Sequence, residues 1–376
     1  MRLSCRTRVG IALAVVLCWT IIDSDSEWTP YYGVRTELLA LNPRYGIGRG
    51  KGPRRRRIQR VPIDLFRYFD DNGGCGNSFQ RLIRLSFEDF LFLMGQLRGH
   101  LDHTAVQSVS LENQVLLVFI WIHHYPTYAS LSIQFGISPG SITRVIDSIL
   151  PQIAQFFKKF IPNQLIPGSP SSRLSNQIVA VIDGTIHRTT RPQSGQFEYY
   201  NVHYSQHGII SQILCDFSGL IIAFITGIKG NTHDSQICSV RNELKRILGG
   251  KYCLGDPAYV GVAGVVAGYK PAHLPKTKGH AKFNTKSREE QVIIEHVNCW
   301  LKKSVSVDKD TKFRHGHGKL VLCTFIVCGL YNYKKINEIQ YYTVSPLKNR
   351  LKRGGGRGNL VKEHFIRSST LSLNRS

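Results

Sequence analysis

The pattern of apolar and polar positions divides the chain into a helical first half and a second half in which strands and helices alternate. Apolar residues recur at helical spacing in residues 86–97 and 110–124. After residue 166 the stretch PGSPSSRLSN predicts a linker. Beyond it, apolar runs predict strands at residues 177–182, 209–216, 220–226 and 251–254, and the intervening pattern predicts helices at 234–248 and 287–303. The second half is therefore expected to be an α/β unit.

Residues 128–150 (YASLSIQFGISPGSITRVIDSIL) have the spacing of two short helices joined by a tight turn. Gly136 suits the turn, Ser138 suits the cap of the second helix, and Pro139 suits its first position, where a missing N–H costs nothing. Apolar residues fall where a helix-turn-helix buries its inner face. The side chains that this arrangement leaves available to a DNA groove are those of Ser141, Thr143 and Arg144. Any helical hairpin with a glycine turn gives the same spacing, so plain packing remains the alternative.

The charge balance changes the picture, because it points to an anionic partner. The chain has 376 residues and a formal net charge of +24. A surplus of this size repels itself unless nucleic acid or an anionic surface lies nearby. A basic protein without a polyanionic partner is the alternative. Residues 45–60 concentrate this charge in a glycine- and arginine-rich segment that includes Arg54, Arg55, Arg56 and Arg57. The segment suits a linker, a nuclear-import signal or phosphate contacts, or it is simply a solvated run of charge.

Two further features bear on the compartment. Residues 9–22 form an apolar run after Arg2, Arg6 and Arg8, which has the shape of a secretory signal and is too short for an ordinary membrane span. The alternative, which we favour, is an apolar N-terminal helix. The nine cysteines are odd in number and form no CxxC pair, which argues against a disulfide framework and a zinc module.

Four acidic residues occupy positions that suit metal chemistry. Asp183 follows the strand-like run IVAVI, Asp234 opens a predicted helix, and Asp256 follows another strand. Glu295 lies within a predicted helix. Carboxylates that meet at one sheet edge are able to hold Mg²⁺ or Mn²⁺, and two such ions support phosphodiester cleavage. Each acid also has an ordinary interpretation: a turn, a helix cap, a strand end and an exposed helix face.

The segment between the first two acids also contains aromatic and imidazole side chains. The segment contains His187, His203 and His207 together with Tyr199, Tyr200 and Tyr204. A lining for a DNA channel is one interpretation, and polar surface is the one we favour.

Several motifs in residues 178–333 resemble the nuclease domain of the PIF/Harbinger family of transposases and their domesticated relatives. The motifs are VAVIDGTIHR, YYNVHYSQHGIISQILCDFSGLI, GNTHDSQI, LGDPAYVG, REEQVIIEHVNCWLKK and LVLCTFIVCGLYNY, in the family's order. The resemblance implies an RNase H-like fold, divalent metal (Mg²⁺ or Mn²⁺), DNA strand cleavage and a Myb-like accessory partner. Carried over by motif, it makes Asp183, Asp256 and Glu295 catalytic, and these three together with Asp234 metal ligands. Glu289 or Glu290 replaces Glu295 if the register of the last helix is different.

These observations together predict a fold, a division of the chain and a function. The fold class is α/β, with an RNase H-like nuclease core preceded by a helical domain containing a helix-turn-helix. The expected divisions are residues 1–60 (apolar helix and basic linker), 61–170 (helical domain), 171–340 (nuclease domain) and 341–376 (basic tail). The expected function is that of a nuclear, metal-dependent DNA endonuclease or transposase that does not associate with membranes. The alternative is a domesticated DNA-binding protein without catalysis.

Overall fold

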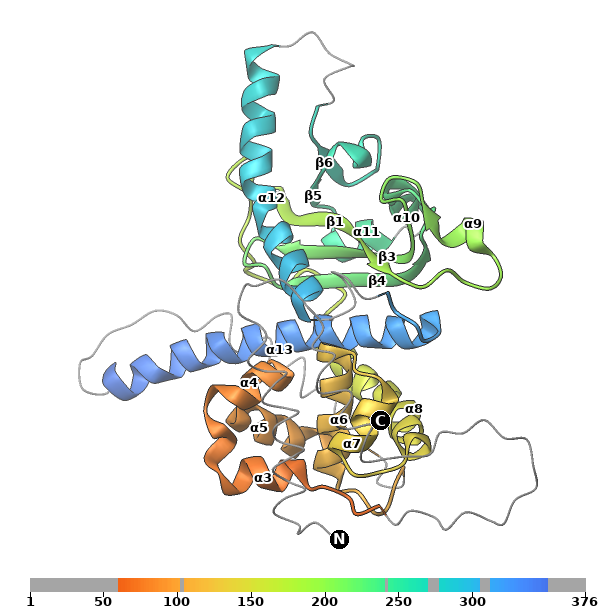
Figure 1. The fold of residues 1–376 in the computed structure, drawn as a ribbon. Helices are drawn as coiled ribbons and strands as arrows, with labels where there is room; N and C mark the ends of the chain where they lie inside the picture. The colour runs from red at the N-terminus through yellow and green to blue at the C-terminus, as the bar shows by residue number, and fades with distance from the viewer. Residues whose placement is uncertain (1–59, 102–104, 241–242, 270–276, 305–311, 351–376) are drawn as a thin grey trace. The chain divides into compact units, whose positions relative to one another are not determined.

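The computed structural model describes residues 60–101, 105–240, 243–269, 277–304 and 312–350 (Figure 1). The apolar run at residues 9–22 and the basic run Arg54–Arg57 lie outside the described residues. The chain forms two compact units that alternate along the sequence. One consists of Met1–Leu93, His103–Leu117 and Pro126–Ile146, and the other of Met94–Asp102, Val118–Tyr125 and Asp147–Ser376. The boundaries between them fall within three helices, so the division does not follow the helical elements.

The first unit begins with short helices that pack through aromatic rings. The elements are α3 (Leu65–Asp71), the 3₁₀ turn η1 (Gly73–Cys75), α4 (Asn77–Ile83), the start of α5 (Phe87–Leu97) and the start of α6 (Leu111–His124). The ring of Phe79 contacts those of Phe69, Phe87 and Phe90. All four side chains are buried, so this aromatic cluster forms much of the core of the short helices.

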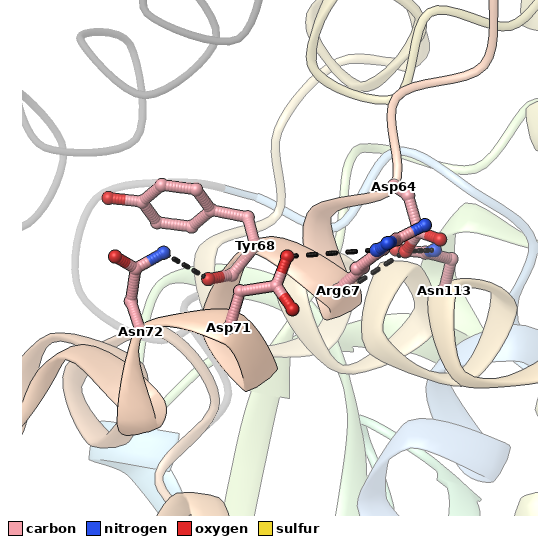
Figure 2. A network of polar contacts seen from close by, with 6 residues as sticks. All are labelled: Asp64, Arg67, Tyr68, Asp71, Asn72 and Asn113. Carbon is pink, nitrogen blue, oxygen red and sulfur yellow. Dashed lines mark hydrogen bonds and ion pairs between the residues drawn. The ribbon is translucent and has the colours of Figure 1, made fainter.

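A polar network caps the first of these helices (Figure 2). The Asp64 carboxylate accepts a hydrogen bond from the backbone N–H of Arg67 and one of 2.6 Å from Asn113 Nδ2. Since the first N–H groups of a helix have no partner within it, the Asp64 side chain satisfies one of them. The contact with Asn113 also ties the start of α3 to α6.

The predicted helix-turn-helix is present as α7 (Tyr128–Gln134) and α8 (Pro139–Lys158). Gly136 lies between them with φ +62°, and a Cβ there would lie 2.1 Å from the carbonyl oxygen of Val61. Only glycine fits this left-handed and crowded position. Ser138 Oγ accepts a hydrogen bond from the backbone N–H of Ser141, as expected for the cap. The prediction of this motif is confirmed down to its turn and cap.

The second unit is built on a six-stranded sheet. Its strands are β1 (Ile178–Arg188), β2 (Tyr200–Asn201), β3 (Gln206–Asp216), β4 (Ile221–Lys229), β5 (Tyr252–Gly255) and β6 (Val265–Ala267). The order is β2-β3-β1-β5-β6, and β4 also pairs with β3. β3 runs antiparallel to β1 and β4, whereas β1, β5 and β6 are parallel. The mixed strand and helix composition of the second half is thereby confirmed.

Helices surround the sheet and complete its core. They are α9 (Gln196–Tyr199), α10 (Asp234–Val240), α11 (Glu243–Leu248), the 3₁₀ turn η2 (Pro257–Tyr259), α12 (Lys278–Ser304) and α13 (His317–Arg350). Ala180 and Ile182 of β1 pack in one buried cluster with Leu248 and Tyr259. Figure 1 shows α12 running beside β1 and β5, which it contacts. No helix among the described residues is long and apolar enough to cross a membrane.

Four sequence-based expectations about these elements need correction. β1 does not end before Asp183 but continues to Arg188, because β3 supplies a hydrogen-bonding partner along that whole length. The helix expected at residues 234–248 is two helices, α10 and α11. The last helix of the motif region begins at Lys278 instead of residue 287. The basic tail expected from residue 341 begins within α13, which extends to Arg350.

Candidate active site

Asp183 lies in the middle of β1, the central strand of the sheet, with β3 on one side and β5 on the other. Asn298 of α12 donates a hydrogen bond of 2.7 Å from Nδ2 to Asp183 Oδ2. Asn298 is itself buried, and within the described part of the chain no donor reaches its Oδ1 atom. The amide therefore fixes one oxygen of the Asp183 carboxylate and presents an acceptor oxygen beside it.

Asp256 follows β5, the strand that runs parallel to β1. Val181 pairs with Leu254 in this ladder, so Asp183 and Asp256 each stand two residues beyond a paired position. Because the strands are parallel, both acids lie at the same level, beside the carboxyl end of β5. The Asp256 carboxylate accepts a hydrogen bond of 3.0 Å from the backbone N–H of Ala258, which caps η2 and fixes the side chain.

Asp234 is the first residue of α10 and lies directly against the backbone of Gly184. A Cβ at position 184 would be 2.2 Å from Asp234 Oδ1 and 2.7 Å from its Cγ. These distances leave no room for a side chain, so glycine after Asp183 allows Asp234 to approach the strand. Gln212, the β3 residue opposite Gly184, donates a hydrogen bond to the Asp234 carbonyl and another to the Tyr259 hydroxyl. These contacts hold the start of α10 over β1.

The three aspartates interact electrostatically. The pKa of Asp183 is raised to about 7, chiefly by burial. The charges of Asp256 and Asp234 contribute to the rise, whereas a backbone hydrogen bond at Gly184 and the charge of Lys302 oppose it. Burial also raises the pKa of Asp234, again with help from Asp256. Desolvation and like charge both disfavour ionised carboxylates. The cluster therefore favours a bound proton or a cation.

Glu295 lies near this cluster along α12 but does not contact it. It is one helical turn from Asn298 and one turn from Gln291, whose Nε2 donates a hydrogen bond of 2.8 Å to the carbonyl of Gly255. The Glu295 side chain is exposed, and it makes no hydrogen bond or ion pair with the residues that the structure describes. The structure thus brings three of the four predicted acids together and leaves Glu295 on the neighbouring helix surface.

Glu290, the alternative to Glu295, faces a different part of the chain. Its carboxylate accepts hydrogen bonds from the Ser172 hydroxyl and, at 2.7 Å, from the backbone N–H of Arg173. Glu290 therefore anchors the segment before β1 to α12. The other nearby acid, Glu289, is exposed.

The arrangement of oxygen donors decides whether a metal ion fits this cluster. Among the described residues, no group of three or more histidine, cysteine, aspartate or glutamate side chains is arranged to hold one ion. Mg²⁺, however, commonly takes only one or two protein carboxylates and completes its shell with water and substrate oxygens. Oxygen donors from Asp183 and Asp256, which lie beside the carboxyl end of β5 and have unfavourable mutual charge, fit that requirement.

The predicted DNA contacts of the helix-turn-helix lie on the first turns of α8. Arg144 is exposed and donates a hydrogen bond of 3.3 Å to Ser141 Oγ. Thr143 is partly exposed, and its hydroxyl donates to the carbonyl of Pro139. The three side chains therefore remain reachable from solvent in the first unit.

The sequence did not predict the site contacts of Asn298, Gln212 and Gln291, because no local pattern distinguishes an amide that contacts a distant strand.

Comparisons with known proteins agree with this arrangement. Residues 182–332 match the family model described as "DDE superfamily endonuclease", and residues 107–159 match "Helix-turn-helix of DDE superfamily endonuclease". The chain is 24% identical over 235 residues to the "Probable transposase for insertion sequence element IS702" of Microchaete diplosiphon. The aligned region covers 60% of this chain and 80% of that protein. No solved structure matches the chain. The first match contains all four acids, and the second contains Ser141, Thr143 and Arg144.

Proposed function

We propose that this chain, with its DDE superfamily endonuclease segment and the helix-turn-helix that accompanies it, is a metal-dependent DNA endonuclease of the PIF/Harbinger transposase type. The observation that carries the proposal is the gathering of Asp183, Asp234 and Asp256 from β1, α10 and β5 at one place, where burial and mutual charge raise the pKa of Asp183 to about 7. Perturbed carboxylates of this kind concentrate at functional sites.

An RNase H-like core belongs to the same proposal. Its support is the order and direction of the strands: β4, β3 and β1 form an antiparallel meander, and β5 and β6 continue the sheet parallel to β1. A single crossover that contains α10 and α11 connects β4 to β5. This arrangement brings Asp183 of the central strand to the level of Asp256, which follows the parallel neighbour β5.

In the proposed site, Asp183, Asp256 and Glu295 are the catalytic residues, and Asp234 joins them as a metal ligand. Two Mg²⁺ or Mn²⁺ ions there would activate the attacking water and stabilise the leaving oxygen of a phosphodiester. Asn298 orients the carboxylate of Asp183, and the backbone of Ala258 orients that of Asp256. Glu295 is exposed on α12, one turn from Asn298, where it is free to turn toward a ligand.

The DNA is proposed to be held by the helix-turn-helix and by the basic surplus of the chain. Arg144, Ser141 and Thr143 supply groove contacts, and Arg54–Arg57 supply phosphate contacts. Phosphate contacts make affinity fall steeply with salt. Nuclear residence and a Myb-like accessory partner complete the proposal, on the basis of the family resemblance. Sequencing the N-terminus of the mature protein tests the compartment, because loss of residues 1–26 would indicate secretion.

A cleavage assay on supercoiled plasmid, with Mg²⁺ or Mn²⁺ and with EDTA, tests the activity. We expect Asp183→Ala and Asp256→Ala to lower the rate by about 10³-fold or more, because each removes a ligand of the ions that would stabilise charge on the reacting phosphate. Glu295→Gln is expected to have a similar effect, while the matched change Glu290→Gln leaves the rate within about threefold. Equal loss in both glutamine variants would contradict the assignment of Glu295, and metal-independent cleavage would contradict the mechanism.

A second candidate function is DNA binding without catalysis, and two features of the site favour it. Glu295 is exposed, and no described group of three or more acids, histidines or cysteines forms a metal cage. This candidate predicts salt-sensitive DNA binding that survives all four acid substitutions, with no cleavage in any divalent metal. Cleavage by the wild-type protein that Asp183→Ala abolishes would exclude it.

A further inference from the structure

The segment between β1 and β3 exposes an unusual amount of apolar surface for its length. Residues 195–205, which we call the aromatic loop, contain α9, β2 and the turn that follows β2. Phe197 is 83% exposed, Val202 79% and Tyr204 51%. Large apolar side chains that are exposed together mark a binding surface more often than scattered ones do.

The aromatic loop has a fixed position. Asn201 Nδ2 donates a hydrogen bond of 2.7 Å to the carbonyl of Gly230, and the backbone N–H of Asn231 donates to the carbonyl of Glu198. Lys229 forms an ion pair of 2.7 Å with Glu198. These contacts attach the loop to residues 229–231, which lead directly into Asp234. Figure 1 shows α9 at the end of the sheet near α10.

Tyr204 brings the loop close to the acidic cluster. Its ring lies 4.9 Å from that of His203 in an edge-to-face arrangement. Burial raises the pKa of the Tyr204 hydroxyl, and the charges of Asp183, Asp234 and Asp256 raise it further. The direction of this shift agrees with the hydrogen bonds that attach the loop to Gly230 and Asn231, a few residues before Asp234.

Cations lie at the base of the same loop. Arg191 Nε donates a hydrogen bond of 2.6 Å to Gln196 Oε1. After burial, the charges of Arg191 and Lys312 lower the pKa of His207. Arg191 and Lys312 therefore add positive charge at the base of a loop that exposes the rings of Phe197 and Tyr204. Aromatic side chains beside basic groups are the usual elements of a site for single-stranded nucleic acid.

We propose that Phe197 and Tyr204 form a stacking platform for unpaired bases of the DNA strand whose phosphate enters the acidic site. This proposal rests on the proposed function, which identifies the strand as the DNA strand that is cleaved. In a paired duplex the flat faces of the bases are covered by their neighbours, so these rings can stack only on bases that have left the helix. The aromatic loop should therefore favour single-stranded or frayed DNA next to the site of cleavage.

Binding of the full-length protein to a single-stranded oligonucleotide, in EDTA and at fixed salt, tests the platform by fluorescence anisotropy. We expect Phe197→Ala and Tyr204→Ala to weaken binding about 5- to 150-fold each, the range for loss of one base–aromatic stack. Tyr204→Phe keeps the ring and should bind within about twofold of wild type. Val202→Ala is the matched control, because Val202 is as exposed as Phe197 but has no ring.

A second readout reports stacking directly. An oligonucleotide containing 5-iodouracil should form a photo-cross-link with residues 195–205, and the cross-link should be lost in Phe197→Ala and Tyr204→Ala. Unchanged affinity in both alanine variants would overturn the proposal. An equal loss of affinity in Val202→Ala would also overturn the proposal, because it would indicate an apolar surface for a protein partner. An equal loss of affinity for intact duplex DNA in the alanine variants would overturn it as well.

The two proposals fail separately. Binding in EDTA does not depend on cleavage, so the stacking result stands even if no nuclease activity is found. Conversely, metal-dependent cleavage with normal binding by the loop variants would leave the nuclease intact and remove the platform.

Discussion

The raised pKa of Asp183 predicts that the ionised carboxylate destabilises the metal-free fold. The structure gives a value of about 7, against an ordinary 3.8. The folded protein therefore binds this proton more tightly than the unfolded chain does. The stabilisation is fully present below pH 3.8 and is lost as the pH rises through 7. With about 1.4 kcal/mol per pH unit, the cost is roughly 2 kcal/mol at pH 5 and roughly 4 kcal/mol at pH 8.

The neutral variant Asp183→Asn removes this cost while keeping the size of the side chain and an acceptor for Asn298. In EDTA, urea unfolding followed by circular dichroism should show the variant more stable than wild type, by up to roughly 4 kcal/mol at pH 8 and by up to roughly 2 kcal/mol at pH 5. Added Mg²⁺ should stabilise the wild-type protein by about 1.4 kcal/mol at tenfold the dissociation constant, and the variant much less.

Asp216→Asn is the matched control, because Asp216 is a buried carboxylate with a structural role. Its Oδ1 accepts hydrogen bonds from the backbone N–H groups of Ser218 and Leu220. Weakening these bonds should destabilise the protein by about 1–3 kcal/mol at both pH values. The reasoning about Asp183 would be refuted if Asp183→Asn were destabilising at pH 8, or if its effect were independent of pH.

Three further predictions follow from single contacts. Gly184→Ala should displace Asp234 and lower the rate of plasmid cleavage by about 10²-fold or more. Gly279→Ala is the control and should leave that rate unchanged, because the nearest atom lies 3.8 Å from the added Cβ. Ser138→Ala should cost about 1 kcal/mol in urea unfolding, because α8 loses its cap; no change would mean that the cap is redundant. Glu290→Gln should also destabilise the protein by about 1–2 kcal/mol and still cleave DNA, since it loses charge-assisted bonds to the segment before β1.

Features set by neighbouring residues were predictable from the sequence. The helix-turn-helix was predictable because Gly136, the capping residue Ser138 and Pro139 lie within four consecutive residues. The position of Asp234 at the start of a helix has the same local origin. The strands β3, β4 and β5 were recognised within a few residues, because their apolar runs are short and bounded by turns.

Features set by distant partners were not predictable. The length of β1 depends on its register with β3, so no local pattern indicates that Asp183 lies mid-strand. The hydrogen bond from Asn298 to Asp183 spans 115 residues, and the contact of Glu290 with Ser172 spans 118. Both contacts depend on the orientation of α12 relative to the sheet. For the same reason, helical periodicity alone left Glu290 and Glu295 as alternatives, and the role of Glu295 stays a prediction.

The central place of β1 has a consequence for how the site moves. Strand residues that are paired on both edges exchange their amide hydrogens only when much of the sheet opens. In β1 these residues are Ala180 and Val181, so we expect Asp183, two residues further along the strand, to lie on a slowly opening part of the unit. Asp234 lies at the start of the short helix α10, and Glu295 is exposed on α12. In hydrogen–deuterium exchange, residues 179–183 should therefore be among the last to label, and any adjustment that accompanies a bound ion should occur at Asp234 and Glu295 around a stationary Asp183.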